Sequence, residues 1–284
     1  MSNQQVLRKR LQSTQNIQNI AEAIEKIASV KFHKLLSKME HLRFYVSKLS
    51  EMILNLESRA DHPFFGVRPA VNRIAVIVVT GDKGLSGSYN TTVLKQTNEF
   101  LSKYRPKQVE LILVGQKAID HFKKRKQWTI RSSLNHVSAQ LNESTIKAVA
   151  EDYTKSFLNH EFDELWIVYT QFHSVLTKSV KIERILPLHK MESTSTETGG
   201  SYIFEPSSEL IYQQIIPYFF YTKILSMLFE SQASELASRM VSMQAATKNA
   251  EEMIKKLTLI KNKVRQQSIT REILEINAGA EVAR

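Results

Sequence analysis

The 284-residue sequence has no cysteine, and its 8 glycines and 6 prolines are about half the usual share of a globular protein. Without cysteine the chain can have no disulfide framework, no thiolate metal site and no cysteine nucleophile. Thirteen of the fourteen helix-breaking residues lie from Pro63 to Pro217, and only Gly279 follows them. Two long segments, 1–62 and 218–278, are therefore free of breakers.

Long hydrophobic runs are also absent. Runs such as IAVIVV at 74–79 are far shorter than the roughly 18 residues of a membrane-spanning helix. The start, MSNQQVLRKRLQSTQ, is polar and lacks the apolar stretch of a signal peptide. At 42% hydrophobic and 24% charged residues, the chain can bury a core. Its formal charge of +11 predicts an anionic partner: nucleic acid, a membrane face or an acidic protein surface.

The N-terminal segment 3–58 has the spacing of one long helix. Its first apolar stripe is Ile17, Ile20, Ile24 and Ile27. A heptad seam then runs from Ala28 through Phe32, Leu35, Met39, Leu42, Val46, Leu49, Ile53 and Leu56. Apolar positions every 3.5 residues are typical of a coiled coil, and such a helix is roughly 80 Å long.

The C-terminal segment repeats this pattern. Its seam is Leu236, Met240, Met243, Thr247, Ala250, Ile254, Leu257 and Val264. Polar Lys261 and Ser268 fall on the same seam, and we expect the pairing to loosen there. Gly279 is expected to stop the helix. Two long segments at opposite ends of one chain can pair antiparallel, so the sequence predicts a coiled coil of the two termini.

The middle of the chain changes period. Segments 73–80, 109–115 and 164–172 are short, apolar and β-branched, and segment 179–188 is a candidate additional strand. Helical patterns at 90–104, 116–126 and 139–159 lie between them, while the Ser/Thr/Gly-rich 191–201 is expected to be an exposed loop. Alternating strands and helices predict a Rossmann-like α/β domain with a mostly parallel sheet. The expected domains are 1–62, 63–207 and 208–284, with the two terminal helices paired.

The turn TGDKGLSGSYN at 80–90 follows a strand and precedes a helix, where α/β proteins bind phosphate. A nucleotide-binding enzyme is therefore one hypothesis. The glycine spacing fits neither the P-loop nor the dinucleotide motif, and a tight turn explains the glycines equally well. The eight histidines form no H-x-x-x-H pair, so no metal site and no cofactor are expected.

Positive charge supports another hypothesis, a coiled-coil adaptor or nucleic-acid binder. The run KKRK at 123–126 could neutralise phosphates, although cations at a helix end are ordinarily just solvated. Residues 1–60 hold 10 Lys and Arg against 5 Asp and Glu, with Lys26, Lys31, Lys34 and Lys38 along the middle of the helix. This face suits contact with an acidic surface.

Several motifs resemble the gamma subunit of F-type ATP synthases. The segment 234–280 contains SELASRM, AATKNA, NKVRQ and ITREILEI in the order in which that family carries them. The family's R-x-x-S-x-Q-N opening is present at 10–16, its D-[RK]-G-L-x-G-x-x-N turn at 82–90, and its YIFEP segment at 202–206. The resemblance spans nearly the whole chain.

This resemblance implies a rotating central shaft without a catalytic site or a cofactor. In the family, the terminal helices project into a hexamer of alpha and beta subunits, and the α/β domain lies on the membrane-embedded c-ring near the epsilon subunit. No nucleic acid is then a partner. Association with the inner, cytoplasmic face of a bacterial cell membrane would be peripheral, through the complex alone. A chloroplast-type regulatory cysteine loop is absent.

The resemblance also assigns contact residues by position. Residues implied to contact the catalytic subunits are Arg265, Gln266, Ile24, Lys26 and Lys31. Those implied to contact epsilon or the membrane ring are Asp82, Lys83, Gly84, Leu85, Gly87 and Asn90 in the turn, and Tyr202, Phe204 and Glu205 in the foot. The chain departs from the family pattern at Lys26, Arg271, Asn277 and Glu281, which make its shaft more polar.

Overall fold

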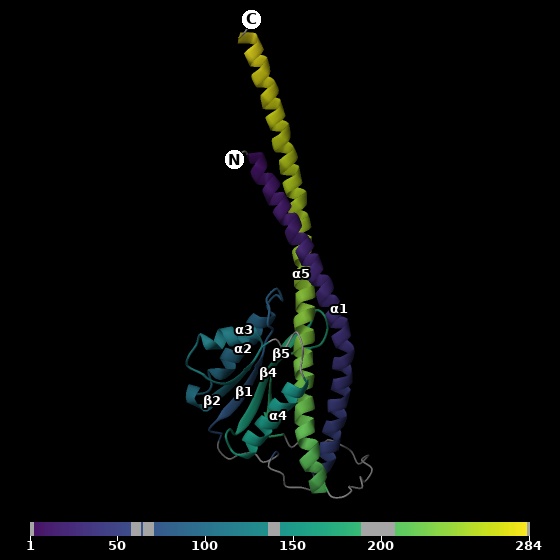
Figure 1. The fold of residues 1–284 in the computed structure, drawn as a ribbon, viewed down its shortest axis with the longest axis vertical. Helices are drawn as coiled ribbons and strands as arrows, with labels where there is room; N and C mark the ends of the chain where they lie inside the picture. The colour runs from purple at the N-terminus through teal and green to yellow at the C-terminus, as the bar shows by residue number, and fades with distance from the viewer. Residues whose placement is uncertain (1–2, 58–63, 65–70, 136–142, 189–207, 283–284) are drawn as a thin grey trace. The chain divides into compact units, whose positions relative to one another are not determined.

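The computed structural model describes residues 3–57, 64, 71–135, 143–188 and 208–282. The chain forms two compact units, residues 1–29 with 239–284 and residues 30–238. Helices α1 (Asn3–Glu57) and α5 (Ser208–Val282) contribute residues to both units (Figure 1). These units divide the chain within α1 and α5, whereas the expected domain boundaries lie at 62 and 207. The expected boundaries stay a prediction.

The unit of residues 30–238 is built on a five-stranded sheet in the order β3-β2-β1-β4-β5. Its strands are β1 (Ile74–Val79), β2 (Val109–Val114), β3 (Thr129–Leu134), β4 (Glu164–Phe172) and β5 (Lys178–Leu186). The first four strands in this order are parallel, and β5 runs antiparallel to β4 at the edge. The prediction of a mostly parallel sheet with an added edge strand is therefore confirmed.

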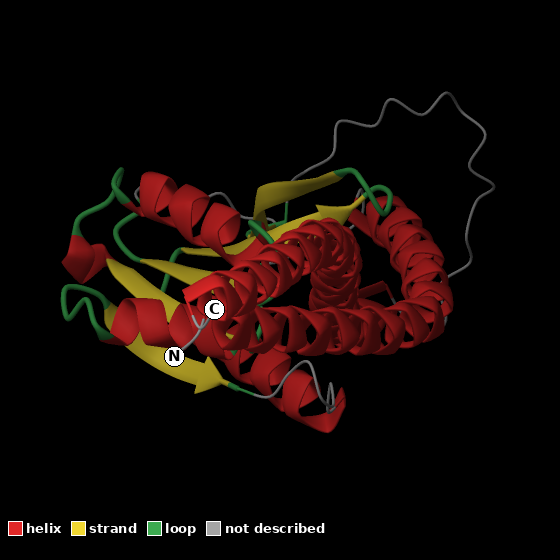
Figure 2. Ribbon diagram, turned by 90° about the horizontal axis from the view of Figure 1, so that it is seen from above, coloured by secondary structure: helices red, strands yellow, loops and turns green. Residues whose placement is uncertain are grey.

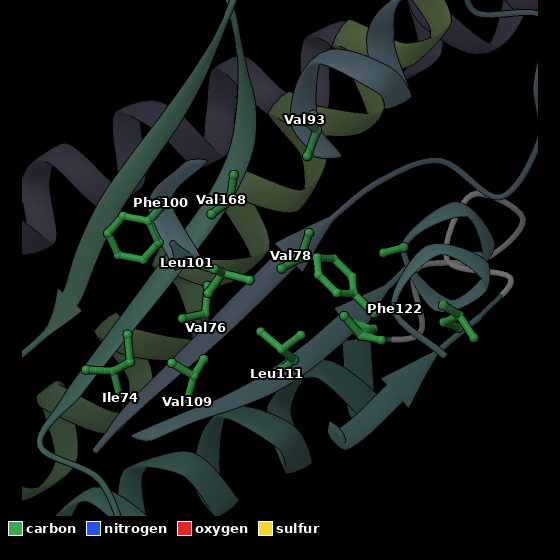
Figure 3. Packing of buried hydrophobic residues seen from close by; sticks show 13 residues of the cluster. Ile74, Val76, Val78, Val93, Phe100, Leu101, Val109, Leu111, Phe122 and Val168 are labelled. Carbon is green, nitrogen blue, oxygen red and sulfur yellow. The ribbon is translucent and has the colours of Figure 1, made fainter. Parts of the chain in front are cut away.

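Helices cover both faces of this sheet (Figure 2). They are α2 (Tyr89–Leu101), α3 (Gln116–Lys123) and α4 (Glu143–Leu158), with a 3₁₀ turn at Pro106–Gln108. Alternate side chains of β1, Ile74, Val76 and Val78, pack against α2 and α3 in a buried cluster with Leu101 and Phe122 (Figure 3). This cluster anchors the helix that follows the 80–90 turn.

Strand β3 is the one strand that the sequence pattern did not predict. Four of the six residues in its sequence, TIRSSL, are polar, and most of its residues are only partly buried. An edge position explains this, because an edge strand needs fewer apolar residues than a central one. The guanidinium of Arg131 on β3 forms ion pairs with Glu110 at 3.0 Å and Glu161 at 2.8 Å, which fasten the edge.

The seam of α1 is confirmed from Ala28 onward, and it also extends further toward the N-terminus than predicted. Phe32, Leu35 and Met39 are buried, and so are Leu49 and Ile53. Leu42 and Val46 are half-buried, and the side chain of Leu56 lies outside the described residues.

Upstream of Ala28, the buried positions are Ala21 and Thr14, which continue the same seven-residue spacing. Ile17, Ile20 and Ile27 are instead 55–59% exposed, and Ile24 is half-buried. The isoleucine stripe therefore lies beside the seam, not in it.

Helix α5 keeps the predicted seam. Its seam residues are buried (Leu236, Met243, Ala250) or half-buried (Met240, Thr247, Ile254, Leu257, Lys261, Val264, Ser268). In the unit of residues 1–29 and 239–284, the Thr14 hydroxyl lies 3.8 Å from the Met253 sulfur, and the Gln18 amide lies 3.5 Å from a Glu251 oxygen. Because the partner number falls as the α1 number rises, the two helices run antiparallel there, as expected.

The ends of α5 differ from expectation. The helix continues through Gly279 to Val282, so the predicted stop at that glycine is wrong. A single glycine costs about 1 kcal/mol relative to alanine, which is too little to end a helix by itself. The helix also includes Pro217, which removes one backbone hydrogen bond but leaves the helix continuous. The segments 189–207 and 65–70, with the foot residues Tyr202, Phe204 and Glu205, lie outside the described residues.

Candidate functional site

The turn at 80–90 is held by its own polar side chains. The Asn90 amide oxygen accepts a hydrogen bond from the Gly81 N–H at 2.8 Å, and its nitrogen donates to the Lys83 carbonyl at 3.3 Å. A carboxylate oxygen of Asp82 accepts the N–H of Gln116, the first residue of α3, at 3.1 Å. Asp82 therefore caps α3, and Asn90 braces the turn across its base.

Two residues of this turn adopt left-handed backbone conformations, Leu85 at φ 63° and Gly87 at φ 57°. Glycine adopts this region at little cost, whereas leucine does so rarely. The Leu85 side chain is 61% exposed, so the strained backbone presents an apolar group to the outside.

The crevice at the carboxyl ends of β1 and β4 is the point where sheets of this kind bind ligands. The chain leaves β1 through α2 toward β2 on one side, and it returns through α4 to β4 on the other side of β1. Ligands of open α/β sheets bind at such a switch in strand order. A nucleotide would be expected at this position if the chain were a nucleotide-binding enzyme.

Helix α5 fills this crevice with its own side chains. A methyl group added to Gly81 would lie 2.5 Å from a carboxylate oxygen of Glu235, so the glycine allows the close approach of that side chain. A cavity of about 20 Å³ lies beside it at the ends of β1 and β2, lined by Thr80, Tyr89, Glu235 and neighbouring residues. Such a cavity holds about one water molecule. At the switch point itself, Ser231 and Ser234 of α5 form hydrogen bonds with the backbone of Thr170 in β4, so α5 occupies the place where a nucleotide would bind.

Helix α1 is tied to the same end of the sheet. The Arg43 guanidinium donates from Nε to Glu230 of α5 at 2.9 Å and from Nη2 to the carbonyl of Phe172, the last residue of β4, at 2.9 Å. The Glu230 side chain is 8% exposed, and that of Arg43 is 45% exposed. Burial, with the nearby carboxylates of Glu183 and Glu230, raises the pKa of Tyr169 well above its usual range, so this tyrosine stays neutral.

A second, open cleft of about 570 Å³ lies where the 80–90 turn meets α2 and α3. The predicted contact residues Gly84, Leu85, Gly87 and Asn90 all line it. Its cationic side chains are Lys117, Lys124 and Arg125, the last two from the basic run at 123–126. The one carboxylate in the lining, Asp120, accepts a hydrogen bond from the Gln116 amide. The cleft therefore suits an acidic surface better than a basic one.

His121 lies in the lining of the same cleft. Its Nε2 is 3.1 Å from the Asn98 amide nitrogen, and Arg125 donates to the oxygen of that amide at 3.1 Å. Burial and the neighbouring Arg125 lower the pKa of His121 below its usual 6.5. The ring is therefore neutral at physiological pH, and it can accept a hydrogen bond from Asn98.

Four of the five predicted contacts on the long helices are exposed, and the fifth, Ile24, is half-buried. Arg265 and Gln266 are exposed side chains of α5, and Lys26 and Lys31 are exposed side chains of α1. In the described part of the chain, no three histidine, aspartate or glutamate side chains converge as a metal site. None of the described helices is apolar over a length that could span a membrane.

The polar residues of α5 in the crevice were missed by sequence reasoning. Glu230, Ser231, Ser234 and Glu235 are each 6% exposed or less. The signal was present, because these residues interrupt the apolar run from Ile224 to Leu236 and include the start of the SELASRM motif. A helix that buries polar groups at adjacent positions must meet hydrogen-bonding partners.

The fold and the packing of α5 at the crevice define a class of protein in which an α/β domain packs against two long terminal helices. Residues 3–282 match the family described as ATP synthase. The chain is 43% identical to the ATP synthase gamma chain of Protochlamydia amoebophila over 99% of both chains. It is 34% identical to that of Fusobacterium nucleatum over 96% of this chain and 97% of the relative.

Solved structures agree on the fold. A chain of the Euglena gracilis mitochondrial ATP synthase, from a structure of OSCP, F1 and the c-ring, has a TM-score of 0.71 at 19% identity. The match covers 98% of this chain and 94% of that one. The chain described here belongs to the ATP synthase gamma chain family.

Proposed function

We propose that this chain is the central shaft of a rotary ATP synthase and has no catalytic site of its own. It would transmit torque between an ion-driven membrane ring and a hexamer of alpha and beta subunits. The observation that carries the proposal is the packing of α5 against Gly81 after β1 and Thr170 in β4, where a sheet of this kind would bind a nucleotide. Membership of the gamma chain family supports the same role.

The exposed isoleucines of α1 support a partner around the helices. Ile17, Ile20 and Ile27 would rest against apolar side chains of the catalytic hexamer, while Lys26 and Lys31 would face its acidic segments. Arg265 and Gln266 would hydrogen-bond a loop of a catalytic subunit, because a guanidinium offers fixed donors to a carboxylate.

We propose that the basic cleft beside the 80–90 turn contacts the epsilon subunit or the membrane ring. Gly84, Leu85, Gly87 and Asn90 line it, whereas Asp82 caps α3 within the chain. We place the protein at the inner face of a bacterial cell membrane, held there through the complex.

The test is purification of the ATPase complex from native membranes. We expect the chain to co-purify with the alpha and beta subunits, and ATP-driven ion pumping to require it. Its absence from the ATPase, together with binding to RNA or DNA, would contradict the shaft and favour a nucleic-acid binder. Saturable micromolar binding of ATP to the full chain alone would favour a nucleotide-binding enzyme.

The role of Arg265 is tested by Arg265→Ala, with Lys263→Ala as the matched control on the same helix. Both side chains are exposed, so neither change should alter the fold. We expect Arg265→Ala to lower the rate of coupled ATP synthesis, measured in membrane vesicles, while Lys263→Ala leaves it unchanged. Equal rates in the two variants would remove the role assigned to Arg265.

A further inference from the structure

Four polar side chains of α5 are buried together at the crevice. Glu230, Ser231, Ser234 and Glu235 occupy adjacent positions one turn apart, so they share one side of the helix. Their residue exposures are 6%, 1%, 0% and 3%. Burying polar groups is expensive, and apolar side chains of similar volume would pack the same interface more stably. Stability alone does not explain this choice of residues.

Each of these side chains reaches a different part of the α/β fold. Ser231 Oγ lies 2.9 Å from the Tyr89 hydroxyl at the start of α2, and it accepts the N–H of Thr170 in β4 at 3.3 Å. Ser234 Oγ donates to the carbonyl of the same Thr170 at 3.3 Å. The Glu235 carboxylate lies against Gly81, just after β1. Helix α5 is therefore held at β1, α2 and β4 at once.

Helix α1 joins the same arrangement through Arg43, which bridges Glu230 and the carbonyl at the end of β4. Among the described residues, Glu230 Oε2 and Thr170 Oγ1 are buried without a hydrogen-bond partner. Directional hydrogen bonds add to close packing in fixing the rotation of a helix about its axis.

We propose that the ligand crevice of this α/β fold serves as a torque clamp on the shaft. In this clamp, Ser231, Ser234 and Glu235 lock the rotational angle of α5 against β1, α2 and β4, and Arg43 locks α1 to the same point. The clamp rests on the proposed function, because it transmits load only if the chain is a rotor. These are positioning residues, and none of them touches a nucleotide.

The test compares clamp variants in the assembled ATPase complex in membrane vesicles. The double variant Ser231→Ala, Ser234→Ala removes three of the clamp's hydrogen bonds with little change in volume. The control, Thr222→Val, removes a hydroxyl of α5 that is also buried but bonds only to the Tyr218 carbonyl of its own helix. The measured quantity is the number of ions pumped per ATP hydrolysed, normalised to the amount of assembled complex.

We expect the double variant to keep ATP hydrolysis. The number of ions pumped per ATP should fall about threefold or more, because α5 can rotate against β1, α2 and β4 once these hydrogen bonds are lost. Thr222→Val should keep the parental ratio. A second variant, Gly81→Ala, displaces the Glu235 carboxylate by contact and should show the same loss. An unchanged ratio in both the double variant and Gly81→Ala would overturn the clamp.

A comparison of complexes with and without the chain separates failure of the clamp from failure of the proposed function. If complexes that lack the chain pump ions as well as complete ones, the chain is not the shaft and the clamp falls with it. If pumping requires the chain but no clamp variant changes the ratio, the shaft stands and the clamp alone is wrong. A merely structural role would lower the amount of assembled complex without changing the normalised ratio.

Discussion

The two parts of α1 are paired with α5 by different chemistry. In the unit of residues 30–238, the seam residues of α1 are large and apolar, with Phe32, Leu35 and Met39 buried. In the unit of residues 1–29 and 239–284, the buried seam residues of α1 are Thr14, Ala21 and Ala28.

The apolar side chains of the second unit lie on its surface instead. Ile17, Ile20 and Ile27 are more than half exposed. Small seam residues let two helix backbones approach closely but bury little apolar area, so they contribute little free energy of unfolding. The comparison indicates that one helix pair is stabilised by its own core, whereas the other depends on a surrounding partner.

The largest expected effect is in the large-residue seam. Phe32→Ala removes a ring that is 2% exposed and packs against Phe172 with a centroid distance of 5.5 Å. We expect the free energy of unfolding to fall by about 3–5 kcal/mol, because a cavity adds to the lost burial. Urea unfolding of the full chain, followed by circular dichroism, measures it. A loss below about 1 kcal/mol would show that this seam is not the core that we describe.

A smaller effect is expected in the small-residue seam, caused by overpacking instead of by a cavity. Ala28 is 2% exposed, and Ala28→Leu forces three further carbon atoms between two close helices. Overpacking of this kind costs about 1–3 kcal/mol. The control is Val30→Leu, which enlarges a side chain that is 71% exposed. If Ala28→Leu stabilised the chain in the same urea experiment, the helices would not be closely packed at that position.

Ile20→Gln tests the exposed side of the same unit. Ile20 is 59% exposed, so we expect a change in unfolding free energy within about 0.5 kcal/mol for the chain alone. Assembly with the alpha and beta subunits should nevertheless weaken, as measured by the yield of complex at limiting concentrations of the chain. Asn19→Gln, at an exposed polar neighbour, is the control. Equal yields for the two variants would mean that the isoleucines face water in the complex as well.

The smallest expected effect is a pH dependence of stability in the unit of residues 30–238. All eight histidines lie within residues 30–238. Because burial and Arg125 lower the pKa of His121, the unfolded chain binds a proton at this site before the folded chain does as the pH falls. Stability from this group is therefore present above pH 6.5 and is lost as the pH falls toward the lowered pKa.

The measurement is the melting temperature at pH 7.5 and pH 5.5. His121→Gln should make the drop between these two values smaller, because glutamine keeps a hydrogen-bonding side chain but does not titrate. An equal drop in the parent and in His121→Gln would show that His121 does not contribute.

Sequence reasoning recovered the parts of this fold that repeat a strong local pattern. The heptads after Ala28 and the apolar strands β1, β2 and β4 each follow a simple pattern of apolar residues, and the structure buries most of those residues. The seam before Ala28 was missed because hydrophobicity drew attention to the isoleucine stripe, although the seven-residue spacing back to Ala21 and Thr14 marked the seam. Strand β3 was missed because an edge strand can be polar.

The crevice could not be predicted from local pattern at all. It depends on a contact between Gly81 and Glu235, which are far apart in the sequence. The motifs at both ends were visible, and a tight turn was one of the two explanations offered for the glycines, of which Gly87 has a left-handed backbone. Only the tertiary structure shows that a side chain of the chain's own helix α5 fills this ligand site.

The most direct test of the shaft is to watch it turn. Because the chain has no cysteine, Lys103→Cys, at an exposed residue after α2, gives it a single attachment point for a bead. The assembled complex is fixed to a surface through its catalytic subunits, and ATP is added. We predict that the bead rotates continuously in one direction while ATP is hydrolysed. A bead that stays in place during hydrolysis, with the chain shown to be in the complex, would contradict the account.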